Sequence, residues 1–181
     1  MRRLFVAGIA LLFSAGCTQA DAGTDGRGAA TSDPFAAYQP SASERDEIVG
    51  ALQRVFDALG SGDAELLRSV MHPDVVMHFA ETNAEGQTSF GSSTLDGLAN
   101  RIQSGGARLI ERMWEPVVST TGSLAMIWTP YDFYVGADFS HCGVDTATLV
   151  EGDDGWQIVA LSWTRQQPPT CELHPEGPPA S

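Results

Sequence analysis

The sequence contains no lysine, so its basic residues are ten arginines, against 23 aspartate and glutamate residues. The resulting net charge of −13 gives the protein an acidic surface, which repels the phosphate backbone of nucleic acids. We therefore expect no nucleic-acid partner, and we interpret the acidity as a contribution to solubility.

The usual motifs of metal binding and nucleophilic catalysis are also missing. No His-x-x-x-His or Cys-x-x-Cys spacing occurs, and the sequence has neither a Gly-x-Ser-x-Gly motif nor a glycine-rich phosphate-binding loop. We therefore expect no metal site and no bound cofactor.

Long hydrophobic runs are scarce, and the longest, residues 4–13, is too short to span a bilayer as a mature helix. It follows Arg2 and Arg3 and precedes a group of small residues. A positive segment, an apolar segment and small residues, in this order, are typical of a signal peptide, which we assign to residues 1–16. The sequence therefore predicts an exported protein.

Residues 14–17, Ser-Ala-Gly-Cys, are similar to a bacterial lipobox, in which the cysteine is lipidated and becomes the first residue. Ser14 departs from the leucine that is usual there. We expect lipidation of Cys17, which would hold this lipoprotein on a membrane facing the periplasm or the cell exterior, with the lipid anchor as its only membrane contact. The alternative is cleavage near Ala20 or Ala22, which would release a soluble secreted protein.

Only three cysteines occur, and Cys17 is unavailable for pairing under either cleavage. In an exported chain the two that remain, Cys142 and Cys171, suggest a disulfide. It would close a loop of about 28 residues and contribute about 3–4 kcal/mol through chain entropy. Two buried or free thiols are the alternative.

Two segments have too few apolar residues to build a core. Residues 17–42 are rich in Ala, Gly, Ser, Thr and Asp, which predicts a flexible tether that begins at the lipidated cysteine. Residues 166–181 form a Pro-rich tail, which we expect to be loose and pinned at Cys171. One folded domain therefore remains between them, over residues 43–165.

Three segments of this domain have the signals of helices. The first begins at Ser41 or Ser43, the second at Asp63 and the third at Ser93 or Thr94, which are residue types that cap helices. The first carries apolar residues at 3.6-residue spacing: Ile48, Leu52, Val55, Phe56 and Leu59. Glycine or proline follows each helix: Gly60 and Gly62, Pro73, and Gly105 and Gly106.

The rest of the domain reads as strands, and residues 81–92 read as a loop. Runs rich in β-branched and aromatic residues predict strands at 74–79, 108–119, 123–135, 139–150 and 156–164. The last four are joined by short turns, which predicts an antiparallel meander. The helices must cover one face of this sheet, so the fold class is α+β.

This order of elements resembles the nuclear-transport-factor-2-like superfamily. Met71-His72-Pro73-Asp74 looks like the family's entry into its first strand, and Asp154-Gly155-Trp156-Gln157-Ile158-Val159 looks like its last hairpin. Residues 128–134 and 140–145 are similar to a bacterial branch labelled SnoaL-like or lumazine-binding. The resemblance implies a cone-shaped, strongly curved antiparallel sheet packed on three N-terminal helices, with a pocket in the cone. Its members include isomerases, dehydratases and ligand-binding proteins, so the fold does not determine function.

His141 and Asp145 are the first candidates for a site in this pocket. They lie four residues apart on one strand, so both point to the same face, with Cα atoms about 13 Å apart. His78 lies in the middle of another strand. Alternation places Tyr131 on the face of its strand opposite to Trp128, and sequence does not tell which face is concave. The candidate ligand-binding residues are His78, Trp128, Tyr131, His141, Asp145 and Trp163.

Structural alternatives remain open for the two histidines. His141 is also explained as a satisfied polar residue beside a disulfide-bonded Cys142, and His78 as a core histidine bonded to backbone. The leading interpretation is a domain that binds an unknown small apolar or aromatic ligand, or a protein partner, without a defined catalytic apparatus. The alternative is a cofactor-independent proton-transfer enzyme, an isomerase, lyase or hydrolase, with His141 or His78 as base and Asp145 or Asp132 as partner. A homodimer through the aromatic sheet is a further expectation.

Overall fold

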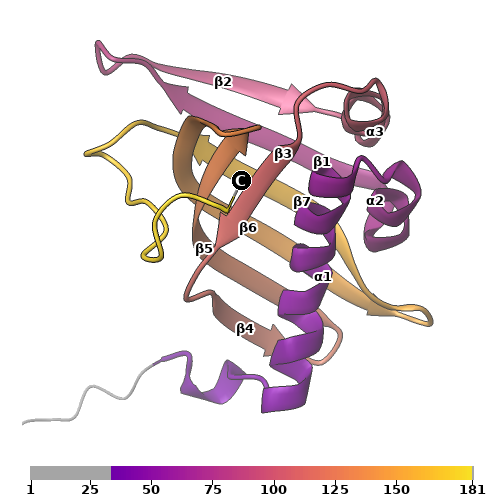
Figure 1. Ribbon diagram of the computed structural model, residues 1–181. Coiled ribbons are helices and arrows are strands. Elements are labelled where there is room, and N and C mark those ends of the chain that lie inside the picture. Colours follow the sequence, from indigo (N-terminus) through magenta and orange to yellow (C-terminus); the bar gives the residue numbers. More distant parts are fainter. Residues whose placement is uncertain (1–33, 181) are drawn as a thin grey trace, which may run out of the picture. The chain divides into compact units, whose positions relative to one another are not determined.

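Three α-helices pack against one face of a curved seven-stranded sheet in the computed structural model, which describes residues 34–180 (Figure 1). The helices are α1 (Ala42–Ser61), α2 (Ala64–Val70) and α3 (Leu95–Gln103), and a short 3-10 helix, η1 (Ala36–Tyr38), precedes them. The predicted α+β class and the three helices are confirmed. The signal peptide, Cys17 and most of the tether lie outside the described residues.

The helix boundaries follow from the capping residues. Ser41, and not Ser43, caps α1: its hydroxyl accepts from the backbone N–H of Glu44, whose carboxylate accepts from the N–H of Ser41. Asp63 caps α2, and Thr94 caps α3. Gly62 ends α1 with a φ of 73°, a left-handed conformation that glycine adopts without strain.

The sheet has the strand order β2-β1-β7-β6-β5-β3, and β4 pairs with β5. Its strands are β1 (Met71–Thr82), β2 (Thr88–Ser93), β3 (Leu109–Met113), β4 (Val117–Thr121), β5 (Leu124–Val135), β6 (Asp138–Gly152) and β7 (Gly155–Arg165). The meander from β5 to β7 is antiparallel, as expected. The pairing of β1 with β7 is parallel, so the sheet is mixed and the expectation of a wholly antiparallel sheet needs this correction.

Two segments differ from the expected strands. Residues 81–92 are not a loop, because β1 continues to Thr82 and forms a hairpin with β2, in which the hydroxyls of Thr82 and Thr88 lie 3.1 Å apart. The turn is closed by Asn83, whose side chain accepts from the N–H groups of Glu85 and Gln87. The single strand expected at 108–119 is two strands, because Glu115 adopts a φ of 48° before Pro116 and interrupts the pairing with β5.

Residues 166–180, here called the C-terminal strap, are held against the sheet rather than loose. The predicted disulfide between Cys142 and Cys171 is present. Gln166 also pairs with Cys142 through two backbone hydrogen bonds, and the side chain of Gln167 donates to the carbonyl oxygen of Ser140 at 2.7 Å. The strap therefore has several attachments on β6 beyond the single one expected.

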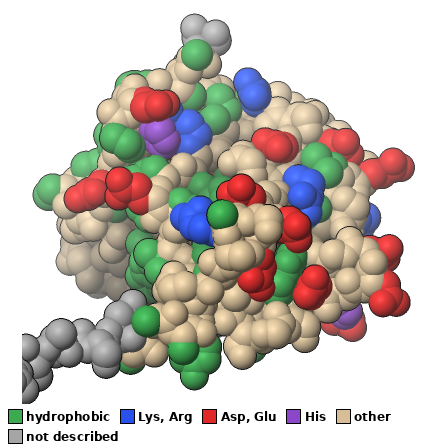
Figure 2. Space-filling view, turned by 90° about the horizontal axis from the view of Figure 1, so that it is seen from below, with side chains coloured by type: hydrophobic (Ala, Val, Ile, Leu, Met, Phe, Trp, Pro, Cys, Tyr) green, Lys and Arg blue, Asp and Glu red, His purple; other side chains and the backbone are tan. Residues whose placement is uncertain are grey.

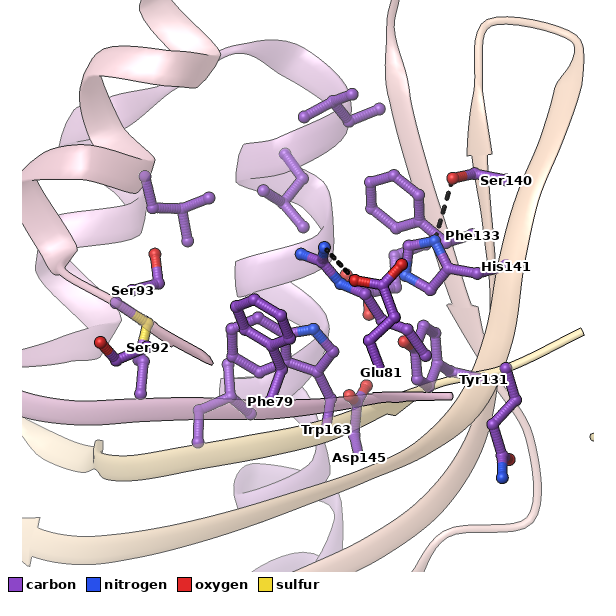
Figure 3. Close-up of a pocket in the computed structure, with 18 of the residues that line it drawn as sticks. Phe79, Glu81, Ser92, Ser93, Tyr131, Phe133, Ser140, His141, Asp145 and Trp163 are labelled. Carbon is purple, nitrogen blue, oxygen red and sulfur yellow. Dashed lines mark hydrogen bonds and ion pairs between the residues drawn. The ribbon is translucent and has the colours of Figure 1, made fainter. Parts of the chain in front are cut away.

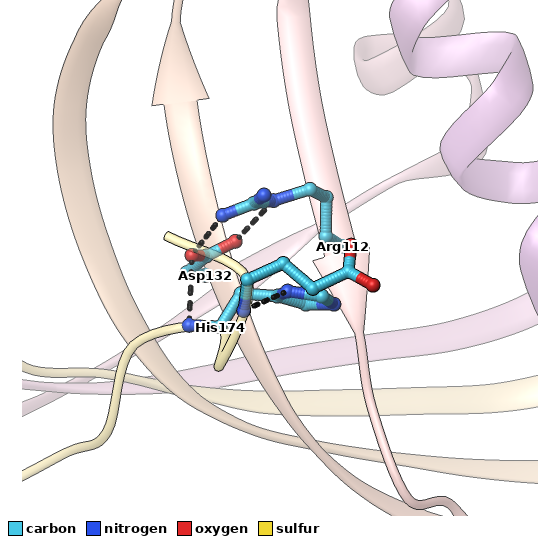
Figure 4. Close-up of polar contacts among 4 residues, drawn as sticks. Arg112, Asp132 and His174 are labelled. Atoms are coloured by element: carbon cyan, nitrogen blue, oxygen red, sulfur yellow. Dashed lines mark hydrogen bonds and ion pairs between the residues drawn. The ribbon is translucent and has the colours of Figure 1, made fainter. Parts of the chain in front are cut away.

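A buried ion pair attaches the strap to β5 as well (Figure 4). Asp132 is fully buried and accepts two hydrogen bonds from the guanidinium of Arg112, at 2.9 and 2.6 Å. Its Oδ2 also accepts the backbone N–H of His174 in the strap at 3.1 Å. The ring of His174 packs edge-on against Trp114. One buried carboxylate thus joins two strands and the strap.

The two faces of the sheet differ in environment. On β5, Ala125, Ile127 and Tyr131 point toward the helices and are buried. Met126 and Trp128 alternate with them and are 58% and 57% exposed on the outer face. The homodimer expected through the sheet stays a prediction for this outer face, and light scattering in solution would test it. On the face of the molecule that Figure 2 shows, acidic side chains are spread widely.

Candidate functional site

A cavity of about 490 Å³ lies between the helices and the inner face of the sheet (Figure 3). Helices α1 and α3 contribute apolar side chains, including Val55 and Leu98. The strands contribute aromatic and ionisable side chains, and Gln166 and Gln167 of the strap line one edge. The ionisable residues of the lining are Glu81, Arg101, Glu111, Tyr131, His141, Asp145 and Arg165.

Stacked aromatic rings form one wall of the cavity. Phe79 of β1 and Trp163 of β7 are neighbours in the parallel pair, and their ring centroids lie 5.5 Å apart with an interplanar angle of 26°. The guanidinium of Arg165 lies 4.2 Å from the centroid of Phe79, within the range of a cation–π contact. It also lies 4.0 Å from the carboxylate of Glu81. This wall offers a flat apolar surface with one charged pair beside it.

His141 lies among aromatic rings on the other side of the cavity. It stacks on Phe133 at 4.9 Å, meets Tyr131 edge-on at 5.7 Å, and its Nδ1 lies 3.0 Å from the hydroxyl of Ser140. Burial lowers the pKa of His141 to about 4, and the nearby charges of Arg165 and Arg101 act in the same direction. At neutral pH His141 is therefore an uncharged ring and a weak base.

Two carboxyl groups meet at the floor of the cavity. Asp145 of β6 is 2% exposed, and its carboxyl lies near enough to that of Glu111 of β3 for each group to affect the pKa of the other. Burial raises the pKa of Asp145 to about 8, although the interaction with Glu111 partly opposes this shift. Burial, followed by the charge of Asp145, raises the pKa of Glu111 well above its usual value. The pair therefore retains at least one proton at neutral pH.

Tyr131 lies on β5, the strand between β3, which carries Glu111, and β6, which carries Asp145. Its hydroxyl donates to the carbonyl oxygen of Thr164 at 2.7 Å, and the residue is fully buried. Burial and then the negative charges of Glu111 and Asp145 raise the pKa of Tyr131. Because its proton is held by a backbone carbonyl, the side chain supports the wall rather than offering a free donor.

Four of the six candidate residues line this cavity: Tyr131, His141, Asp145 and Trp163. The structure places the other two elsewhere. Trp128 lies three residues before Tyr131 on β5, and side chains alternate along a strand. Trp128 therefore points to the outer face of the sheet, away from the cavity. His78 alternates with the inward-pointing Met77 and Phe79, and its ring lies 5.1 Å from that of Phe90. Asp132, considered as a catalytic partner, is instead bound to Arg112 outside the cavity lining.

Glu111 and Arg165 are the important residues that the sequence analysis did not single out. Glu111 lies in the short segment Leu109–Met113. A single acid in this segment was the only sign in the sequence that it could belong to a site. Its partner is 34 positions away in the sequence and two strands away in the sheet, since β5 separates β3 from β6. Pairs of this kind become visible only when the strand order is known.

The described residues 34–180 hold no group of three or more His, Cys, Asp or Glu side chains arranged for a metal ion. Within the same range, no helix has the length and apolar character needed to cross a membrane.

Comparisons with known proteins agree with this architecture. A family model described as "Putative lumazine-binding" matches residues 43–164, and a search of curated proteins found no match. A nuclear-transport-factor-2-like protein from Cytophaga hutchinsonii superposes with a TM-score of 0.54 at 17% identity, covering 67% of this chain and 97% of its own. One with a cystatin-like fold from Novosphingobium aromaticivorans gives 0.53 at 18% identity, covering 68% and 82%. A protein of unknown function from Mycobacterium tuberculosis gives 0.56 at 14%, covering 71% and 75%.

Proposed function

The chain belongs to the "Putative lumazine-binding" family and has the nuclear-transport-factor-2-like fold, and from this premise we propose that it binds a small molecule in the cavity between its helices and sheet. The observation that carries the proposal is the cavity itself. Its volume of about 490 Å³ is in the range of small-ligand sites. Its lining combines aromatic walls with a few polar groups at its floor. Flat rings favour a planar aromatic ligand.

Trp163 provides a direct test of this site, because Trp114, Trp128 and Trp156 do not line the cavity. We expect lumazine, used as a probe, to quench the tryptophan fluorescence of the wild-type protein. The variant Trp163→Phe keeps the aromatic wall and should lose most of the quenching. Native mass spectrometry of the protein purified from its own host should also detect a bound small molecule.

Trp128→Phe is the matched control, since Trp128 lies on the outer face and is 57% exposed. It should retain the quenching of the wild type. Equal quenching in Trp163→Phe and the wild type, together with no small molecule in the native mass spectrum, would contradict binding in the cavity.

We also propose that the protein is exported and lipid-anchored through Cys17, as the order of residues 2–17 suggests. Full-length protein expressed in a bacterium with radiolabelled palmitate should take up the label, and Cys17→Ser should not. Cys171→Ser should remain labelled, because that cysteine lies far from the lipobox. Label retained by Cys17→Ser, or no label on the wild type, would exclude the anchor.

A further inference from the structure

We propose that the cavity selects a planar aromatic ligand that carries a carboxylate, and that Arg165 of β7 binds this carboxylate. The proposal rests on ligand binding in the cavity and adds the charge of the ligand to it. It gives Arg165 the role of the residue that determines specificity.

The guanidinium of Arg165 makes no hydrogen bond with any of the described residues 34–180. Its Nε is buried and has no acceptor, and the one acid paired with it in this range is Glu81, whose Oε2 lies 4.0 Å from Nη1. That distance suits an ion pair but is too long for a hydrogen bond. The side chain is only 29% exposed, and polar groups in such places normally have partners. The open donors of Arg165 therefore point to an acceptor on a bound molecule.

Aromatic rings hold this guanidinium at the wall of the cavity. It lies 4.2 Å from the ring centroid of Phe79 and 5.8 Å from that of Trp163, within the range of cation–π contacts. Contacts of this kind hold the charge without an acceptor atom, so the donors stay open while the side chain is ordered. A group that is already in position loses less entropy when a ligand binds to it.

The open donors and the rings beside them define the class of ligand. A guanidinium is planar, and two of its N–H groups bind both oxygens of a carboxylate in parallel, in bonds about twice as strong as neutral ones. The rings of Phe79 and Trp163 are stacked and offer a flat apolar wall (Figure 3). Because the guanidinium of Arg165 lies so close to Phe79, a ligand that contacts both has its carboxylate attached directly to an aromatic ring.

The other charges of the lining permit an anion beside Arg165. Arg101 of α3 also lines the cavity and has no hydrogen bond or ion pair within the described range. Burial and these two arginines lower the pKa of His141 to about 4, so its ring is uncharged at neutral pH. The carboxyl pair at the floor retains at least one proton. The remaining acid of the lining, Glu81, has a side chain that is 53% exposed, so water weakens its repulsion of an anion.

The test compares 2-naphthoate with 2-naphthamide, two flat probes of nearly the same shape that differ in charge. Isothermal titration calorimetry of the full-length protein at neutral pH measures both affinities. We expect the wild type to bind naphthoate about tenfold or more tightly than naphthamide, because a charge-assisted pair is stronger than a bond to a neutral amide. Arg165→Gln should lose this preference and bind the two probes within about twofold of each other, with little change for naphthamide.

Two further variants separate recognition of charge from a general effect on the fold. Arg68→Gln removes an arginine of α2 that lies outside the cavity lining, and it should keep the wild-type preference. Glu81→Gln removes the carboxylate beside Arg165, so it should raise the affinity for naphthoate by about threefold and leave that for naphthamide unchanged. A merely structural role of Arg165 would change the affinities for both probes together. Circular dichroism should show that the variants are folded.

Equal affinities of the wild type for the two probes would overturn the carboxylate site and leave ligand binding intact. A preference for naphthoate that survives in Arg165→Gln would also overturn it, since the acid would then bind elsewhere. If Arg165→Gln does not fold, Glu81→Gln decides, because an unchanged affinity for naphthoate would contradict a carboxylate bound beside Arg165. If neither probe binds, the ligand is not an aromatic acid and the inference fails, while native mass spectrometry decides separately on ligand binding.

Discussion

Replacing Asp132 by alanine should lower the free energy of unfolding by about 3–5 kcal/mol, the range seen when one partner of a buried ion pair is removed. Asp132 is fully buried, and the side chain of Arg112 is 19% exposed, so the substitution leaves a largely buried guanidinium without its carboxylate. The lower end of the range is expected because Arg112 retains some access to water. Thermal unfolding followed by circular dichroism measures the effect, as a fall in Tm of about 10 °C.

Asp138→Ala is the matched control, because Asp138 is an exposed acid at the start of β6. It should change Tm by no more than about 2 °C, as is usual for surface substitutions. If Asp132→Ala behaved like Asp138→Ala, the ion pair with Arg112 would contribute nothing to stability, and the strap would not depend on it.

Asp132→Ala should also affect the cavity, because the strap connects Asp132 to the cavity wall. Asp132 accepts the N–H of His174, and the disulfide fixes Cys171 to β6. Between this anchor and β7, Gln166 and Gln167 line the cavity. The strap thus forms part of the wall of the cavity, and it is held by Asp132 and Cys142 on the far side of the sheet.

Local signals in the sequence were enough to predict the helices. Ser41, Asp63 and Thr94 carry side chains that satisfy free N–H groups at helix starts, and Gly62 permits the left-handed turn at the end of α1. These interactions span only a few residues, so a single sequence contains them. The disulfide was also predictable, because the predicted cleavage near the N-terminus leaves only Cys142 and Cys171 for pairing.

The β1–β2 hairpin and the parallel pairing of β1 with β7 were not predictable in the same way. Residues 88–93, Thr-Ser-Phe-Gly-Ser-Ser, are polar and mostly exposed, so β2 lacks the apolar alternation that identifies a strand. It forms because β1 offers an edge with free backbone groups. The pairing of β1 with β7 joins segments about 80 residues apart in the sequence, so it cannot be read from either segment alone.

Part of the candidate site followed from alternation, and part depended on topology. Period-two spacing placed His141 and Asp145 on one face of β6, and both line the cavity. It did not reveal which face of β5 is concave, so Trp128 and Tyr131 were both candidates. The pairing of Asp145 with Glu111 depends on β5 lying between β3 and β6, which is a property of the whole sheet.

Replacing Asp145 by asparagine should stabilise the protein, and increasingly so as the pH rises. The pKa of Asp145 is about 8 in the folded protein, against a usual value of 3.8. Between these values the folded protein holds a proton that the unfolded chain has lost, so stability falls as pH rises through this window. The difference of about four pH units corresponds to at most about 5 kcal/mol at pH 8 and above. Asparagine carries no charge and avoids this loss, while its amide can donate to the Glu111 carboxylate.

Thermal unfolding of wild type and Asp145→Asn at pH 5 and pH 8 checks this expectation, with a Tm difference that is larger at pH 8. Asp96→Asn is the control, because the Asp96 side chain is 79% exposed and its substitution should give the same small shift at both values. A Tm difference that does not grow with pH would mean that Asp145 is ionised in the folded protein at neutral pH. A difference that grows would show that the fold retains a carboxyl pair that lowers its own stability.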